Sequence, residues 1–132
     1  VVMGQKSKFL EPLKSLFNLY LGGMIGDGKQ WVSWIHIDDV TSVIDYIIQN
    51  KIYGPINLTS PNPITNANMS STIAQTLGKP NYLHVPKFLY RLMFGESSEL
   101  LTEWHQVFPR LLTDVGYRFK YSDFKDALDD SI

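Results

Sequence analysis

The sequence contains no cysteine, which excludes disulfides, thiolate metal sites and a cysteine nucleophile. It has no stretch of eighteen apolar residues, so we expect no membrane span and no membrane partner. A secretory signal is also missing, because the N-terminus has no basic region followed by an apolar one. Together these absences predict a reducing, cytoplasmic location.

An excess of basic residues is absent as well. The 12 Lys and Arg residues nearly balance the 13 Asp and Glu residues, and the formal net charge is -1. Nucleic-acid binders normally present a basic face, so we expect no nucleic-acid partner. The chain has enough apolar residues to form a hydrophobic core, because 44% of its 132 residues are hydrophobic.

Short apolar strands alternate with helical periodicity, a pattern that predicts an α/β fold. Helices are expected over 9–20, 40–49, 65–77, 86–94, 98–105, 109–116 and 122–128. Thr65 and Ser122 are the expected N-caps of two of these helices, and Gly78 is the expected C-terminal stop of the first of the two. Strands are expected over 31–35, 56–59, 82–85, 106–108 and 117–121. The character of the sequence changes at Pro86, so we divide it into a domain over 1–85 and a small C-terminal domain over 86–132. Residues 1–4 resemble the tail of a buried strand, from which we expect the chain to be the later part of a longer protein.

The stretch over 26–40 carries the strongest functional signal in the chain. Gly26-Asp27-Gly28 predicts a tight turn before an aromatic, β-branched strand. Asp38 or Asp39 then precedes an apolar-periodic run and is expected to cap a helix. Capping explains both aspartates better than catalysis does, since a general base would need a partner and a pocket.

Two indoles and an imidazole lie at this junction: Trp31, Trp34 and His36. A loop that meets a helix N-terminus often lines a small-molecule site. An imidazole there could donate to a substrate oxygen or hold a backbone carbonyl in place. The alternative is that both tryptophans are ordinary core residues.

Several known chemistries lack their motifs. Gly26-x-Gly28 follows an expected helix, so the context of a dinucleotide fingerprint is missing. The chain has neither a P-loop nor a Gly-x-Ser-x-Gly elbow. Its histidines, His36, His84 and His105, lie far apart and have no second ligand four residues on, so we expect no metal site.

Three segments of the sequence together resemble a known family. They are Gly26-Asp27-Gly28-x-Gln30 followed by Trp31–Val40, the segment Asn57–Asn66, and Pro109–Leu112 with Gly116-Tyr117-Arg118-Phe119. They are similar to the extended short-chain dehydrogenases/reductases, the group of nucleotide-sugar epimerases and dehydratases. The resemblance is strongest to a branch named epimerase family proteins, sometimes under a cell-division-inhibitor label, whose members end in a small domain of unknown function.

This resemblance implies that the chain is an incomplete C-terminal part of a Rossmann-type epimerase fold plus a small α/β C-terminal domain. An upstream Rossmann half would bind NADP or NAD and carry the catalytic Tyr-x-x-x-Lys. We therefore expect no cofactor and no catalytic residue in this segment alone. Its role would be the substrate side of an NAD(P)-dependent sugar epimerase, dehydratase or reductase, with Gln30, Trp31, Trp34 and His36 as the substrate-binding residues.

One position departs from the nucleotide-sugar enzymes. Two residues after Gln30 they usually carry an arginine that holds the pyrophosphate, and this chain has Val32 there. Valine cannot donate to a phosphate, so the loss of a bidentate Arg–phosphate contact is large. We expect a smaller or more aromatic substrate than a nucleotide-diphospho-sugar.

A different class of function stays open beside the enzyme part. The residues after Pro86 could serve a partner or a homo-oligomer, with Phe88, Leu92 and Trp104 as the surface. The chain would then be a non-enzymatic binding or dimerisation module. An open pocket lined by Trp31, Trp34 and His36 would favour the substrate role. Their burial, with an apolar patch after Pro86, would favour the module.

Overall fold

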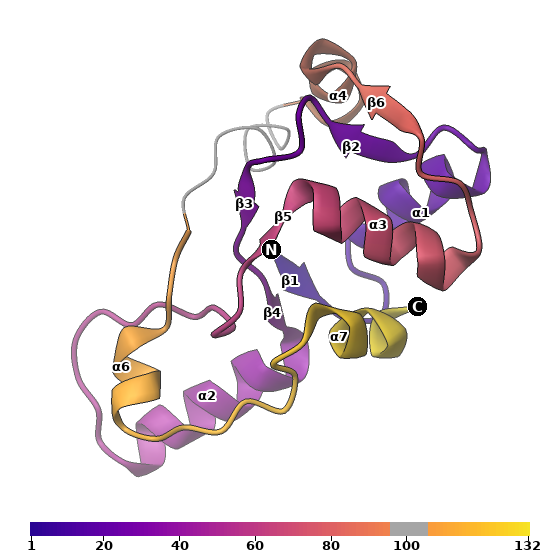
Figure 1. Cartoon of the computed structure of the whole chain (residues 1–132). Helices are drawn as coiled ribbons and strands as arrows, with labels where there is room; N and C mark the ends of the chain where they lie inside the picture. Colours follow the sequence, from indigo (N-terminus) through magenta and orange to yellow (C-terminus); the bar gives the residue numbers. More distant parts are fainter. Residues whose placement is uncertain (96–105) are drawn as a thin grey trace.

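A computed structural model describes residues 1–95 and 106–132 of the chain (Figure 1). Strands and helices alternate along it, which confirms the predicted α/β class. In chain order the described elements are β1 (Val2–Met3), α1 (Leu10–Asn18), β2 (Gly23–Ile25), β3 (Trp31–Val32), β4 (Ile35–His36), α2 (Ile37–Gln49), β5 (Ile64–Thr65), α3 (Asn66–Leu77), β6 (Leu83–Val85), α4 (Lys87–Phe94), α6 (Arg110–Asp114) and α7 (Phe124–Ser131).

Within the described residues the strands form three separate pairs. β1 lies parallel to β4, β2 lies parallel to β6, and β3 lies antiparallel to β5. Every pair joins strands that are remote in the sequence, and helices fill the connections between them. Parallel pairing needs such crossover connections, which explains the βα alternation.

One hydrophobic core lies among α1, α3 and α7 and the strands β1 and β2 (Figure 1). Its fully buried side chains include Phe17 from α1, Ile73 from α3 and Leu128 from α7. Tyr90 of α4 belongs to the same cluster. The core therefore takes residues from both sides of the predicted boundary at 85/86, which stays a prediction.

The two ends of α3 lie at the residues that the sequence predicts. Thr65 caps α3 because its hydroxyl oxygen accepts the backbone N–H of Asn68 at 3.3 Å. Gly78 ends α3 in the left-handed region at φ 64°. α7 begins one residue later than expected, because the carboxylate of Asp123 accepts the N–H of Lys125 and so caps the helix in place of Ser122.

Several expected strands are absent from the described residues. The segments 56–59, 106–108 and 117–121 have no strand pairing, and the helix expected over 98–105 lies outside the described residues. The strand expected over 31–35 is two strands, because the chain changes partner between Val32 and Ile35. Alternation of apolar residues predicts a strand only if a second strand is present to pair with it.

The Gly26-x-Gly28 turn follows strand β2, so the expectation that it follows a helix is wrong. It leads into β3 and not into a helix, which still excludes the dinucleotide fingerprint. A Cβ on Gly28 would lie 2.8 Å from the Cβ of Ala67 in α3. The glycine thus allows the turn to pack closely on α3.

Candidate functional site

Gln30 and Trp31 lie where the turn enters β3. The Gln30 side chain folds back and its Nε2 donates to the Ile25 carbonyl oxygen at 3.1 Å. Its own carbonyl accepts the N–H of Asn66 at 2.8 Å. Gln30 therefore ties the turn to β2 and α3. Trp31 is 37% exposed, which leaves its indole open to a ligand.

Trp34 is a core residue in this structure. Its side chain is 1% exposed, and its indole Nε1 donates to the carbonyl oxygen of Asn62 at 2.9 Å. The ring meets Phe124 of α7 edge-to-face at a centroid distance of 5.5 Å. The indole is thus buried and hydrogen-bonded within the protein, which agrees with the alternative that Trp34 is an ordinary core residue.

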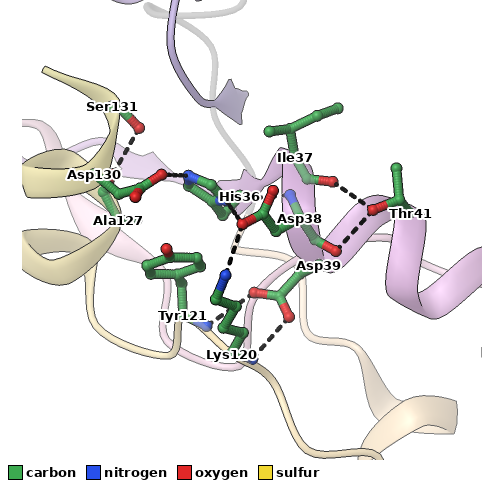
Figure 2. Close-up of polar contacts among 10 residues, drawn as sticks. All are labelled: His36, Ile37, Asp38, Asp39, Thr41, Lys120, Tyr121, Ala127, Asp130 and Ser131. Carbon is green, nitrogen blue, oxygen red and sulfur yellow. Dashed lines mark hydrogen bonds and ion pairs between the residues drawn. The ribbon is translucent and has the colours of Figure 1, made fainter.

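His36 is buried, 1% exposed, and caps α2 in place of the expected Asp38 or Asp39. Its Nδ1 accepts the backbone N–H of Asp38 at 3.1 Å, so the neutral imidazole carries its proton on Nε2. Figure 2 shows Nε2 facing Asp130 of α7, and it lies 3.1 Å from Oδ2. That contact has ion-pair distance but not the direction of a good hydrogen bond. The Tyr121 ring covers the imidazole at a centroid distance of 4.0 Å.

Asp39 is fully buried and binds the C-terminal segment through its carboxylate. Oδ1 accepts the N–H of Lys120 at 2.8 Å, and Oδ2 accepts the N–H of Tyr121 at 2.9 Å (Figure 2). Two backbone amides that would otherwise lack a strand partner are satisfied in this way. The expected cap is therefore a long-range clamp between α2 and the segment before α7.

Asp38 lies beside this clamp but faces solvent. Its Oδ2 accepts from the Lys120 ammonium at 2.9 Å. This hydrogen bond lowers the pKa of Asp38 below its ordinary range, and the same pair raises the pKa of Lys120. Burial and the nearby Asp130 carboxylate raise the pKa of Tyr121. The cluster around His36 therefore contains an ion pair between Asp38 and Lys120, beside an imidazole Nε2 without a well-directed hydrogen bond.

A metal ion does not fit this cluster well, although His36, Asp38 and Asp130 place ligand atoms within 4.8 Å of one another. A metal-bound histidine donates its second N–H to an acceptor. Here Nδ1 faces a donor, the Asp38 amide, so Nε2 keeps its proton. The Lys120 ammonium also already occupies the Asp38 carboxylate. Hydrogen bonding, not coordination, is the chemistry these residues support.

The spacing Tyr-x-x-x-Lys does occur once in this chain, at Tyr121 and Lys125, and the sequence interpretation overlooked it. The two residues do not lie in one helix, because α7 begins at Phe124 with Asp123 as its cap. The Lys125 ammonium pairs with Asp129 at 2.8 Å. Tyr121 instead stacks on His36. The spacing is therefore not assembled into a catalytic pair.

Of the four predicted substrate-binding residues, Trp31 is partly exposed, whereas Trp34 and His36 are buried, and their role in substrate binding stays a prediction. A cleft lies elsewhere, between the proline-containing loop at 61 and the turn after α6. Its lining residues are Pro61, Thr113, Gly116, Tyr117, Arg118, Phe119 and Ser122. Sequence reasoning had assigned 117–121 to a surface strand. The aromatic and basic residues after Gly116 were the sequence signal that could have indicated this cleft.

The apolar surface expected after Pro86 is present in part. Phe88 is 64% exposed and Leu92 is 78% exposed on α4, whereas Trp104 lies outside the described residues. Other apolar side chains, such as Ile48 of α2, are exposed as well. None of the helices described is both long enough and apolar enough to cross a bilayer.

Two solved structures share this fold at 30% sequence identity. A nucleoside-diphosphate sugar epimerase from Corynebacterium glutamicum matches with a TM-score of 0.76 over 99% of this chain and 24% of that one. The human epimerase family protein SDR39U1, solved with NADPH, matches with a TM-score of 0.86 over 97% of this chain and 44% of that one. The chain thus has the α/β fold of part of a Rossmann-type epimerase.

The sequence comparisons narrow this class to one family. Residues 85–131 match the model of a domain of unknown function, DUF1731. Epimerase family protein SAR0825 of Staphylococcus aureus is 35% identical over 133 residues, which cover 100% of this chain and 44% of the relative. The chain is similar to the epimerase family proteins and corresponds to a C-terminal portion of them, as the motifs predicted. It spans less than half the length of the curated relatives it matches.

Proposed function

We propose that this chain forms the substrate side of an NAD(P)-dependent sugar epimerase, dehydratase or reductase and is not catalytic by itself. The observation that carries the proposal is the match to 44% of human SDR39U1, a protein solved with NADPH. The remaining part of such a protein would bind NADP or NAD. A cytoplasmic location, expected from the cysteine-free sequence, belongs to the same proposal.

Among the four predicted substrate-binding residues, Trp31 is the best candidate for direct contact. Its indole is 37% exposed, whereas Trp34 and His36 are each 1% exposed. Gln30 already uses its Nε2 on the Ile25 carbonyl. In this proposal Trp31 contacts the substrate, and the other three hold the turn and β4 in place behind it.

The substrate is proposed to be smaller or more aromatic than a nucleotide-diphospho-sugar. Val32 is completely buried in the core and pairs with Ile64 of β5. An arginine at this position would have to bury its charge, which is strongly unfavourable without a partner. The aromatic face of Trp31 next to it suits a ring without a pyrophosphate.

The test compares NADPH binding by the 132-residue chain with binding by a chimaera. In the chimaera this chain replaces the matching portion of Bacillus subtilis epimerase family protein YfhF, which is 38% identical over 130 residues. NADPH fluorescence should change only with the chimaera, and UDP-sugars should not bind it at micromolar concentration. NADPH binding by the chain alone would overturn the proposal that the cofactor is bound by the remaining part of the protein.

The binding or dimerisation module remains the second candidate, and the exposed side chains of Phe88 and Leu92 favour it. An exposed apolar patch of this kind often marks a contact with another protein. Light scattering after gel filtration should then give a dimer that becomes a monomer in Leu92→Glu. Ile48→Glu on α2 is the matched control, because Ile48 is similarly exposed. If the chain is a monomer at all concentrations tested, the hypothesis that it forms homo-oligomers through α4 is wrong.

A further inference from the structure

The cleft beside α6 has a chemistry that the proposed function does not use. We infer that it binds a small organic anion that carries a ring, with Arg118 as the residue that holds the anionic group. The cleft has a volume of about 460 Å³. Small-molecule pockets are typically roughly 300 to 1,000 Å³, so this cleft matches a ligand of monosaccharide or benzoate size.

Both walls of the cleft are fixed by contacts from other parts of the chain. The Asn62 amide Nδ2 donates to the carbonyl oxygen of Ser122 at 2.8 Å and joins the loop at 61 to the C-terminal segment. The buried Asp39 carboxylate binds the backbone amides of Lys120 and Tyr121 just before this point. The cleft is therefore formed before a ligand arrives, which lowers the entropic cost of binding.

One wall is aromatic and rigid. Tyr117 meets Tyr46 of α2 edge-to-face at 5.3 Å between ring centroids, and it meets Phe119 in the same way at 4.9 Å. Burial and the nearby Asp39 carboxylate raise the pKa of Tyr117, so its phenol stays neutral. Together with Pro61 across the cleft, these rings offer apolar surface to the face of a ligand ring.

Arg118 carries the charged side chain among the residues that line the cleft. No carboxylate is among the residues that line it. Within the part of the chain that the structure describes, Arg118 makes no ion pair, whereas the neighbouring Lys120 is taken by Asp38. A guanidinium presents two parallel N–H groups to a carboxylate or phosphate. The hydroxyls of Thr113 and Ser122 add polar contacts for a hydroxylated ring.

The experiment is a titration of the 15N-labelled chain followed by amide chemical shifts. The probes are glucose 1-phosphate, benzoate and inorganic phosphate, each added separately. A ring-bearing anion should shift the amides of residues 113–122, and inorganic phosphate should bind the same residues more weakly. Arg118→Gln should weaken binding about tenfold or more, the loss expected for one charge-assisted contact. Arg118→Lys should retain part of the affinity.

The matched control is Arg110→Gln, which removes an exposed arginine of α6 that does not line the cleft. It should leave all affinities unchanged. The proposal is overturned if no probe shifts the amides of 113–122, or if Arg118→Gln and Arg110→Gln bind equally. If inorganic phosphate binds as tightly as the ring-bearing anions, the cleft does not recognise a ring, and the proposal of a ring-bearing ligand is wrong. Because Arg118 is exposed, its replacement should not disturb the fold. The amide spectrum of the variant without ligand checks this.

Discussion

Replacing Asp39 by Asn should release the C-terminal segment from α2. The Asp39 carboxylate is completely buried and accepts two backbone N–H groups, from Lys120 at 2.8 Å and from Tyr121 at 2.9 Å. An amide has one oxygen, so Asn satisfies one of these donors and turns its own NH2 group toward the other. One backbone N–H is then left facing a donor inside the protein.

The size of the effect follows from these two bonds. A hydrogen bond to a charged group contributes about 1.5–3 kcal/mol, and an unsatisfied buried donor costs about as much. Because Asn keeps one bond in neutral form, we expect Asp39→Asn to lower the free energy of unfolding by about 2–3 kcal/mol. A small domain has a total stability of roughly 5–15 kcal/mol, so the variant should still fold.

Urea unfolding followed by tryptophan fluorescence measures this change, and amide hydrogen exchange locates it. Exchange should accelerate most at Lys120 and Tyr121, the two amides bound by Asp39. The matched control is Asp38→Asn, since the adjacent aspartate has a 44% exposed side chain and accepts its hydrogen bond from Lys120 at the surface. Equal loss of stability in the two variants would refute the clamp.

Three further perturbations follow from the structure. Trp34→Ala should lower the free energy of unfolding by about 3–5 kcal/mol because it empties a core site, whereas Trp31→Ala should change it by less than about 1 kcal/mol; thermal unfolding compares the two. Gly23→Ala should disrupt the pairing of β2 with β6, since the new Cβ would meet a backbone carbonyl of β6, and hydrogen exchange in β6 would show it. Because Lys120 lowers the pKa of Asp38 from 3.8, the pair contributes stability above that pH and loses it as the pH falls through the folded-state pKa. Unfolding measured from pH 7 to pH 2 should therefore converge for the wild type and Lys120→Met at the acidic end, and a constant difference would contradict the ion pair.

Local sequence signals were sufficient for the helices. Apolar spacing predicted α1, α2, α3 and α7, because a helix that covers a core needs one apolar face. Thr65 and Gly78 predicted the two ends of α3, since each acts on backbone groups within four residues of itself. The family motifs were likewise readable, because they are contiguous.

The strands and the candidate site depended on distant residues. His36 caps α2 through a local contact with the Asp38 amide, but it is buried because Tyr121 and Asp130 cover it from the C-terminal segment. The burial of His36 could not be predicted from residues 26–40, because the residues that cover it lie in the C-terminal segment. The strand expected over 117–121 has the right alternation but finds no strand to pair with, and Asp39 satisfies its amides instead.

The sequence by itself determined the α/β class, the helices and the similarity to the epimerase family proteins, since periodicity, caps and contiguous motifs act over a few residues. Only the tertiary structure decided that Asp39 holds amides 81 and 82 residues away and that Trp34 fills the core while Trp31 remains open. It also assembled the Arg118 cleft from a loop and a turn that are remote along the chain. Burial and hydrogen-bond partners are properties of the packed chain, and residue spacing alone cannot supply them.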